Sequence, residues 1–345
     1  MKHLSSITEI SKQRDSSLDA VSGFLIIFMM YCHLMFWSQL YNHHFHEVLL
    51  HVFAFYMVWF FFKGGLFAKA GESQLSVVSK SFHRLIVPYI IFSLIGVFFY
   101  WLDLRCQGHV GMRWFVVRNV RFLLQRGTFY GNLPLWFLFT LFLVRLIFNL
   151  LVRYRYTDII LVLLILTLYL LRYLDVLGIG GHLFYPFWLY NTIMGLAYYW
   201  LGYRLRPLLH HPKTFLVSLL PFILLIPYIK LSYDFRSSTA GGDFLLTIVF
   251  CLASCFVAVG ISRWFCHSFP ISIETFVAPL RRLLIHFGKH SIEYLCIHWI
   301  IITFLHFSVV VPLDLPNGTS HFFVYLFGLI ILLPLIRPLA KHCFF

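Results

Sequence analysis

AVSGFLIIFMMYCHLMFWSQL, residues 20–40, is an apolar stretch without a single Asp, Glu, Lys or Arg. A helix rises about 1.5 Å per residue, so a stretch of this length crosses the roughly 30 Å hydrocarbon core of a bilayer. The residues before it are hydrophilic, and the stretch is too long for the apolar region of a cleavable signal peptide. We therefore expect it to remain in the protein as the first transmembrane helix.

Similar apolar stretches recur along the whole chain, and each is long enough to cross a membrane as a helix. They lie near residues 48–68, 85–103, 133–152, 158–175, 184–202, 214–231, 243–262, 291–311 and 321–339. No linker or internal repeat marks a second domain. The sequence therefore predicts an all-α, polytopic integral membrane protein with about ten transmembrane helices, folded as one transmembrane domain over residues 1–345.

Composition supports a protein that faces lipid. Hydrophobic residues make up 60% of the chain, charged residues 12%, and the mean hydropathy is +0.83. A soluble domain carries about 25% charged residues. The net charge of +14 is spread singly or in pairs at the ends of apolar stretches, which suits anionic lipid head groups and argues against nucleic-acid binding. The cysteines form no CxxC pair, so neither a zinc site nor a disulfide framework is indicated.

The distribution of basic residues predicts the orientation. Most of the 27 Lys and Arg residues fall in segments on the same side as the N-terminus when the predicted spans alternate. By the positive-inside rule that side is the cytoplasm. We expect both termini in the cytoplasm, and reporters at Gly108 and Asn317 to read as external.

The segment between the third and fourth spans is an exception, because it is external yet rich in arginine. At 100° per residue, residues 113–126 place valine and leucine side chains on one face and Arg118, Arg121 and Gln125 on the other. This pattern predicts a helix lying flat at the outer interface. Two interpretations remain open: the arginines contact lipid head groups, or they bind an anionic acceptor.

Three ionisable groups lie at predicted membrane depth, where their cost marks them as candidates for function. They are Asp19, His33 and Lys63. On the first helix, Asp19, Ser22 and His33 share one stripe at 100° per residue. Asp19 and His33 are roughly 21 Å apart along the axis, too far to touch. A single histidine in a span is more often structural than catalytic, so position alone does not decide its role.

Five stretches of the chain together resemble the membrane-bound acyltransferase-3 family. They occur in the family's order over nearly the whole chain. They are Arg14-(x)4-Asp19 followed by Gly23 and His33; FFFKGG at 60–65, in place of Phe-Phe-x-x-Ser-Gly; HRLIVPY at 83–89, like Arg-Leu-x-x-Pro-Tyr; LWFL at 135–138, like Trp-Phe-Leu; and GKHSIEYLCIH at 288–298, like Ser-x-x-Tyr-Leu-x-x-His.

The resemblance implies an enzyme of the plasma (bacterial inner) membrane that takes an acyl group, usually acetyl, from acyl-CoA on the cytoplasmic side. It implies a hydroxyl acceptor on an envelope glycan or lipid-linked saccharide. His33 matches the family's presumed catalytic base, and Arg84 lies in its cytoplasmic basic motif. Trp136 falls in the Trp-Phe-Leu motif, and Tyr294 and His298 in the last motif, where they share a helix face and are expected to line the substrate site.

The chain departs from the family pattern at two places. Ser22 stands where the family usually has Arg or Lys, eleven residues before the histidine. Lys63 occupies a position that is apolar in most members, and Gly64 replaces the serine. We expect Lys63 to face the first helix and to supply the missing positive charge, acting with Asp19 and His33 in catalysis.

The chemistry of acyl transfer to an alcohol is consistent with these residues. It needs a base at the hydroxyl, which imidazole can provide, and positive groups for the phosphates of acetyl-CoA. Arg14, Lys80, Arg84, Arg281 and Arg282 lie on the predicted cytoplasmic side and are expected to bind this donor. No GxSxG or similar nucleophile motif is present, which favours direct transfer over an acyl-enzyme.

Other interpretations are weaker but remain open. The cluster His43, His44, His46, Glu47 and His51 does not match HExxH, and we expect an open outer loop there with no metal. A lipid-linked glycan transporter or flippase would also have many spans and intramembrane charges. The absence of an inverted repeat counts against it. A receptor-like or purely structural membrane protein does not account for the charges at membrane depth.

Overall fold

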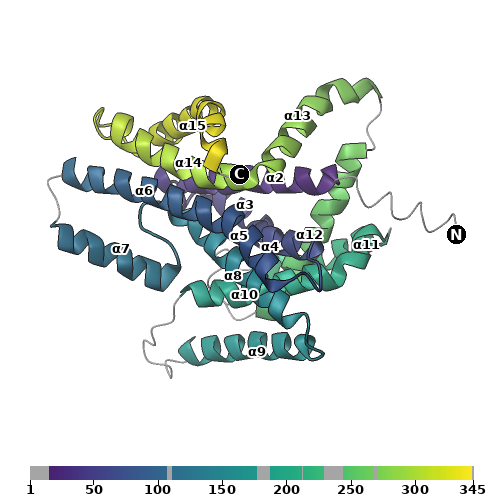
Figure 1. The fold of residues 1–345 in the computed structure, drawn as a ribbon. Helices are drawn as coiled ribbons and strands as arrows, with labels where there is room; N and C mark the ends of the chain where they lie inside the picture. The colour runs from purple at the N-terminus through teal and green to yellow at the C-terminus, as the bar shows by residue number, and fades with distance from the viewer. Residues whose placement is uncertain are drawn as a thin grey trace.

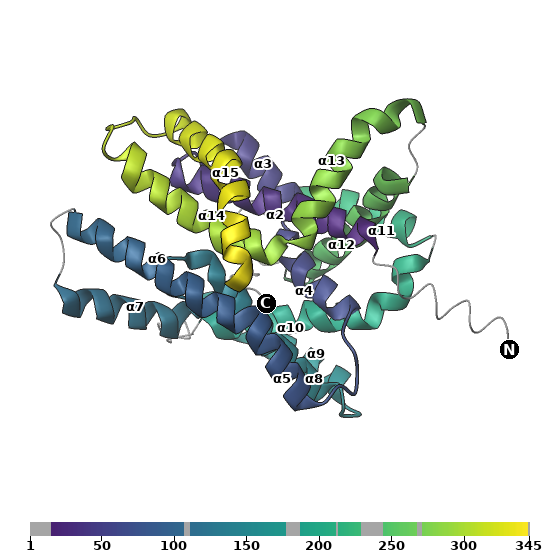
Figure 2. The same ribbon diagram turned by 45° about the horizontal axis from the view of Figure 1, so that its top comes forward.

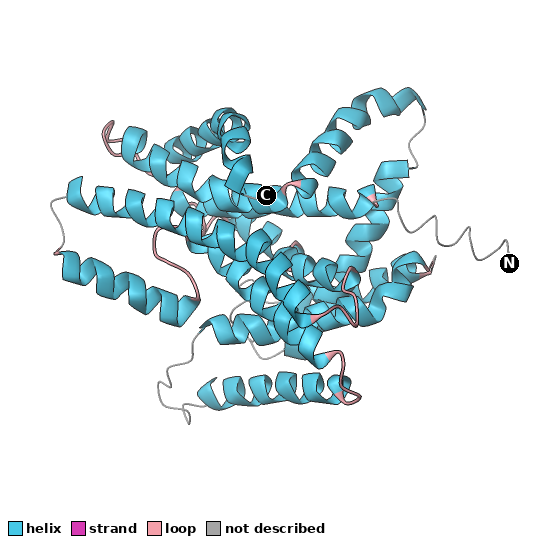
Figure 3. Cartoon of the chain, viewed as in Figure 1, coloured by secondary structure: helices cyan, strands magenta, loops and turns pink. Residues whose placement is uncertain are grey.

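The structure is a computed structural model that describes residues 15–106, 111–176, 187–211, 213–228, 244–267 and 271–343. Every regular element within these residues is a helix (Figure 3). The predicted all-α fold class is therefore confirmed. Two positions named above, Arg14 and Gly108, lie outside the described residues.

Figure 1 shows the order and arrangement of the helices. Four short elements matter below: η1 (Phe82–Ile86), η2 (Leu133–Leu135), η3 (Arg206–His210) and η5 (His306–Val310). The α-helices are α2 (Ser16–Trp37), α3 (His44–Val52), α4 (Tyr56–Leu66), α5 (Gln74–Ser81), α6 (Val87–Cys106), α7 (Met112–Arg126), α8 (Trp136–Leu151), α9 (Thr157–Val176), α10 (Phe187–Leu205), α11 (Thr214–Leu225), α12 (Phe244–His267), α13 (Ile271–Lys289), α14 (Ser291–Leu305) and α15 (Thr319–Ala340).

Several of these helices have the length and composition of membrane spans, as a multi-pass membrane protein requires. Within the described ranges, 7 helical stretches are long and apolar enough to cross a bilayer. They are Ser16–Trp37, His44–Leu66, Gln74–Arg105, Leu133–Leu151, Leu245–His267, Ser291–Val310 and Thr319–Ala340. The other three predicted spans fall on α9, α10 and α11, which are not among the 7. The count of about ten crossings therefore stays a prediction.

The histidine-rich stretch before α4 is helical, which corrects the expectation of an open outer loop. It forms α3 and continues into the span His44–Leu66. His46 is 3% exposed, and its ring meets that of Tyr31 edge-on with the centroids 5.5 Å apart. Within α3, His46 is the residue that is buried, so this histidine packs inside the bundle.

α2 lies at the centre of the bundle, in contact with α4, α12, α13, α14 and α15. In Figure 2 the α14–α15 turn and the adjoining ends of α6 and α7 lie at one side of the molecule. The start of α2 and the facing ends of α12 and α13 lie at the opposite side. We call these two sides the turn end and the α2-start end.

Glycine allows α2 and α13 to approach backbone to backbone. A Cβ added to Gly23 would lie 1.8 Å from the carbonyl oxygen of Leu284, and one added to Gly288 would lie 1.8 Å from that of Asp19. No side chain fits at either position, so small residues set this crossing as they do in many membrane bundles. Gly23 and Gly288 belong to the first and last of the five stretches noted above, which therefore meet in space.

Candidate functional site

The clearest site is a histidine pair that α2 and α14 bring together. Nδ1 of His33 lies 2.8 Å from Nε2 of His298, although the two residues are far apart in the sequence. The rings are nearly parallel, with an interplanar angle of 7° and centroids 5.0 Å apart. His298 is 0% exposed, whereas His33 is half-buried. His33 is thus the member of the pair that a substrate can reach.

A backbone carbonyl fixes the direction of this hydrogen bond. Nδ1 of His298 lies 2.8 Å from the carbonyl oxygen of Tyr294, which can only accept, so Nδ1–H of His298 donates to it. In the neutral imidazole, Nε2 of His298 then carries the lone pair, and Nδ1–H of His33 donates to that lone pair. The remaining nitrogen of His33, Nε2, is left unprotonated. That nitrogen is the one able to accept a proton from a substrate.

Aromatic side chains hold the ring of His33 in place. The indole of Trp299 meets the His33 ring at 90° with the centroids 5.1 Å apart. Trp299 is 5% exposed and also contacts Trp37 and Phe36. Rings packed in this way restrict the rotation of the imidazole and keep water from its faces. The pair is therefore a fixed, partly dry site.

A turn between α7 and α8 is attached to α14 next to the histidine pair. Nδ2 of Asn132 donates to the carbonyl of Cys296 over 3.1 Å, two residues before His298, and η2 packs on α14. Asn132 is 0% exposed, and its Oδ1 has no hydrogen-bond partner among the residues that the structure describes. Trp136, expected in the substrate site, begins α8 directly after η2. Motif matching found Trp136 but not Asn132, because asparagine in a loop carries no signal by itself.

A second polar cluster lies nearer the start of α2, around Lys63. Its ammonium group donates to Oδ1 of Asp19 over 3.1 Å, to Oγ of Ser22 over 2.8 Å and to the carbonyl oxygen of Leu18 over 3.3 Å. Lys63 therefore lies beside the first helix, where the sequence predicts it. Asp19 is 2% exposed, so the ion pair is largely withdrawn from solvent.

Ser22 is the centre of this second cluster. Its hydroxyl donates to the carbonyl oxygen of Leu18 over 2.8 Å and accepts from Lys63 and from Nε1–H of Trp59, the latter over 2.9 Å. One donor and two acceptors are the full capacity of a hydroxyl, and all are used. The three N–H groups of Lys63 likewise have acceptors. We call Asp19, Ser22, Trp59 and Lys63 the lysine cluster.

Two of the residues expected to bind the donor lie near α5. Lys80 is exposed and pairs with Glu72, and this hydrogen bond is the main reason why the pKa of the Glu72 carboxyl is lowered. Arg84 is exposed on η1, the π-helical turn that joins α5 to α6. Both residues therefore lie on one wall of the bundle.

The other two donor-binding candidates lie on α13. Arg281 forms an ion pair with Glu274 and donates to the carbonyl of Cys266 over 3.1 Å. Arg282 is exposed one residue later. α5 and α13 are well separated in both Figure 1 and Figure 2. The structure therefore does not bring all four basic side chains to one place.

The predicted amphipathic helix exists as α7, and the two arginines expected to bind the acceptor, Arg118 and Arg121, differ. The Arg118 guanidinium lies among three rings, 3.9 Å from the centroid of Tyr130, 4.7 Å from Trp114 and 5.8 Å from Tyr100. Such cation–π contacts occupy the faces of the guanidinium. Arg121, one turn along α7, is exposed. Only Arg118 is therefore held in a fixed position.

The start of α14 carries an ionisable cluster that sequence reasoning missed. Glu293, 7% exposed, accepts from Nε–H of Arg337 over 2.6 Å and contacts Nδ1 of His290 at 2.7 Å. Nη1–H of Arg337 donates to Nε2 of His286 over 3.0 Å. Glu293 lies within a predicted span, so the criterion that selected Asp19 would have found it. Tyr294 is 5% exposed, and its backbone carbonyl accepts the hydrogen bond from Nδ1–H of His298.

Comparison with known proteins leaves the site to be interpreted from its own geometry. Among the described residues, no three His, Cys, Asp or Glu side chains are grouped so that they could hold a metal ion. No family model, no curated protein and no solved structure matches the chain.

Proposed function

We propose that the protein is an integral membrane O-acyltransferase that moves an acetyl group from acetyl-CoA to a hydroxyl of an envelope glycan or lipid-linked saccharide. The observation that carries the proposal is the 2.8 Å contact between His33 and His298, with His298 in turn donating to the carbonyl of Tyr294. This arrangement leaves Nε2 of His33 with a lone pair and holds it in one orientation. A fixed neutral imidazole is the group that general-base catalysis requires.

In the proposed reaction, Nε2 of His33 accepts the proton of the acceptor hydroxyl while the hydroxyl oxygen attacks the thioester carbonyl of acetyl-CoA. The new C–O bond forms, and the C–S bond then breaks. The imidazolium returns the proton to the departing thiolate, which leaves as free CoA. Nε2 of His298 stabilises the transient positive charge on His33 by accepting its Nδ1–H. No proton is gained or lost overall, and neither a metal nor a covalent enzyme intermediate is needed.

The position of His33 along α2 suits two substrates that arrive from opposite sides. Asp19 lies near the start of α2, and His33 is roughly 21 Å further along the axis. With the α2-start end in the cytoplasm, acetyl-CoA approaches from that side, and its flexible arm extends toward His33. The acceptor approaches from the turn end, near the arginines of α7. The proposed location is the plasma membrane of a bacterium, with both termini cytoplasmic.

Charged groups take different roles in this proposal. Lys80 and Arg84, which lie together near α5, bind the phosphates of acetyl-CoA, and Arg281 and Arg282 on the separate α13 are not assigned to the same phosphates. The lysine cluster holds the Lys63 ammonium paired with Asp19 beside the first helix. Arg118 and Arg121 bind an anionic part of the acceptor, and lipid head groups are the alternative partner for them.

The test uses purified full-length protein in detergent with acetyl-CoA labelled on the acetyl group. An acyltransferase should bind the labelled donor and hydrolyse it slowly, because water can replace the acceptor. A glycan flippase should do neither, and this result would contradict the proposal. The matched control for His33→Ala is Cys32→Ala, its neighbour on α2. Analysis of the envelope glycans that lose acetyl groups upon gene deletion then identifies the acceptor.

A further inference from the structure

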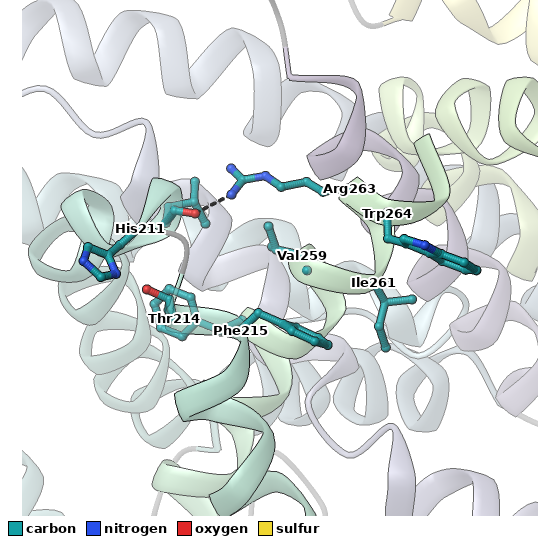
Figure 4. A pocket seen from close by; sticks show the side chains of 10 residues that line it. His211, Thr214, Phe215, Val259, Ile261, Arg263 and Trp264 are labelled. Carbon is teal, nitrogen blue, oxygen red and sulfur yellow. Dashed lines mark hydrogen bonds between the residues drawn. The ribbon is translucent and has the colours of Figure 1, made fainter. Parts of the chain in front are cut away.

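A cavity lies away from the histidine pair, between the start of α11 and the last turns of α12. Its volume is about 470 Å³, within the range of small-molecule sites. Phe215 of α11 and Phe256 and Val259 of α12 form its apolar walls, and Arg263, His211 and Thr214 provide polar groups (Figure 4). The cavity is thus amphipathic, with one guanidinium in a mostly hydrocarbon lining.

On α12, the ring of Phe256 and the guanidinium of Arg263 belong to two different parts of the lining. Phe256 and Arg263 are seven residues apart, or about 10 Å by helical rise. In Figure 4 the Arg263 side chain lies on one side of Val259, and Phe215 and Ile261 lie on the other. A ligand that fits this distribution has an anionic group joined to a hydrocarbon chain.

The rim of the cavity faces outward at the edge of a candidate membrane span. Ile261 and Trp264 contribute to the lining and are 53% and 58% exposed. The span Leu245–His267 ends three residues after Trp264. Tryptophan and arginine concentrate at this depth, where the hydrocarbon core gives way to head groups. Lipid is therefore the solvent at the open side.

We propose that this cavity binds one acyl chain of an anionic phospholipid from the leaflet at the α2-start end, with the lipid phosphate beside Arg263. Arginine recognises phosphate through paired N–H donors, and the surrounding low dielectric strengthens the interaction. The exposed cations Arg206 and Lys213, close in sequence to His211, add positive charge near the head group. The inference is independent of the proposed acyl transfer, because it concerns a different part of the bundle.

A bound lipid would reinforce the contact between α12 and α2. Arg263 donates to the backbone carbonyl of Leu209 and lies 3.5 Å from Oδ2 of Asp15, the N-cap residue of α2. One residue earlier, the hydroxyl of Ser262 donates to the carbonyl of Ser17 over 2.8 Å. The guanidinium therefore connects η3, α12 and the start of α2. A ligand that binds only the folded state raises its stability.

The experiment is native mass spectrometry of the full-length protein in detergent, titrated with phosphatidylglycerol or phosphatidylcholine carrying identical chains. We expect phosphatidylglycerol to bind at least tenfold more tightly. Arg263→Gln should weaken this binding about tenfold, whereas Arg263→Lys should retain most of it. Val259→Phe, which fills the apolar wall without changing Arg263, should also reduce lipid binding. Arg155→Gln, which removes an exposed cation on the turn between α8 and α9, is the matched control for loss of one positive charge and should change the affinity less than threefold.

Two further additions distinguish other sources of the same chemistry. Inorganic phosphate should not displace phosphatidylglycerol, because it lacks the chain. CoA should not displace it either. Displacement by CoA would assign the cavity to the acyl donor and overturn the lipid proposal. Equal binding of phosphatidylglycerol by Arg263→Gln and the unaltered protein would also overturn it. Thermal unfolding of each variant without lipid separates a failure to bind from a failure to fold.

Discussion

The two polar clusters on α2 differ in whether their hydrogen-bonding capacity is complete. In the lysine cluster, the ammonium group of Lys63 has three acceptors and the hydroxyl of Ser22 uses its one donor and two acceptors. At the histidine pair, the chain from Tyr294 through His298 to His33 ends in a lone pair on Nε2 of His33. One cluster is closed, and the other is open at a single atom.

This difference distinguishes two roles for polar groups at membrane depth, where placing such groups costs free energy. A closed cluster stabilises one arrangement of helices, because breaking it leaves a buried charge without its partner. An open cluster can exchange a proton with a substrate, because one nitrogen makes no hydrogen bond within the described part of the chain. We therefore expect changes in the lysine cluster to affect stability first and changes in the histidine pair to affect turnover first.

The largest effect is expected at the open end of the histidine pair. Removing a positioned general base typically costs 10²–10⁴-fold in rate. His33→Ala should thus abolish acetyl transfer while the protein still inserts into the membrane and binds acetyl-CoA. The measurement is transfer or slow hydrolysis of labelled acetyl-CoA, with Cys32→Ala as the control. Near-normal turnover of His33→Ala would return this residue to a structural role.

His298 should affect turnover by orienting His33. His298→Leu removes the acceptor for Nδ1–H of His33, a hydrogen bond that gains charge in the reaction, so kcat should fall roughly 10- to 100-fold. His298→Gln offers an amide oxygen in a similar place and should recover part of the loss. KM for acetyl-CoA should stay unchanged in both. Equal activity of the Leu and Gln variants would show that His298 acts through its size alone.

The closed cluster predicts a stability effect. Lys63→Leu leaves the Asp19 carboxylate buried without its ammonium partner, which should cost about 3–5 kcal/mol of folding free energy. Ser22→Lys combined with Lys63→Leu places an ammonium group near the same point and should restore both stability and activity. Thermal unfolding in detergent measures the first and acetyl transfer the second, with the exposed Lys69→Leu as a control. If the double variant recovers neither, Lys63 does not replace a basic residue at position 22.

Arg118 and Arg121 of α7 are the residues expected to bind the acceptor, and Arg118 is held by aromatic rings whereas Arg121 is exposed. The double change of Arg118 and Arg121 to Gln should raise the KM for acceptor several-fold, about 1 kcal/mol, and leave that for acetyl-CoA unchanged. Of the single variants, Arg118→Gln should have the larger effect because its guanidinium is already held by aromatic rings. If neither constant moves in the double variant, the arginines contact lipid head groups instead.

The smallest effect is expected at the start of α14, as a dependence of stability on pH. Burial lowers the pKa of the His286 imidazole, and the positive charges of Arg337 and His290 lower it further. Below the ordinary histidine value near 6.5 the unfolded chain then binds more protons than the folded one. Stability should therefore decrease as pH falls through that range. His286→Gln should flatten the decrease, whereas the exposed His83→Gln should not.

The sequence was informative wherever a helix carries its own periodicity. The run of residues 20–40 and the valine-rich face of 113–126 both predicted helices that the structure contains. The spacing of Tyr294 and His298 predicted that they share a helix face. In the structure the His298 ring donates a hydrogen bond to the backbone carbonyl of Tyr294. These relations lie within one helix, so the 3.6-residue repeat determines them.

Contacts between side chains on different helices could not be predicted from this repeat. The partner of His33 is 265 residues away in the chain, and no local pattern states which helix packs against which. The pairing of Glu293 with Arg337 across α14 and α15 was missed for the same reason. The four donor-side cations were grouped by predicted topology, but topology specifies a side of the membrane rather than a position on it.

The glycine contacts between α2 and α13 fix a crossing point on the first helix. At Gly23 and Gly288 the two backbones are in contact, so neither position has room for a side chain. His33 lies ten residues beyond Gly23, an arm of about 15 Å. A rotation of α2 by about 4° at this crossing would therefore shift the imidazole by about 1 Å. A displacement of that size can cost a hundredfold in the rate of an enzyme.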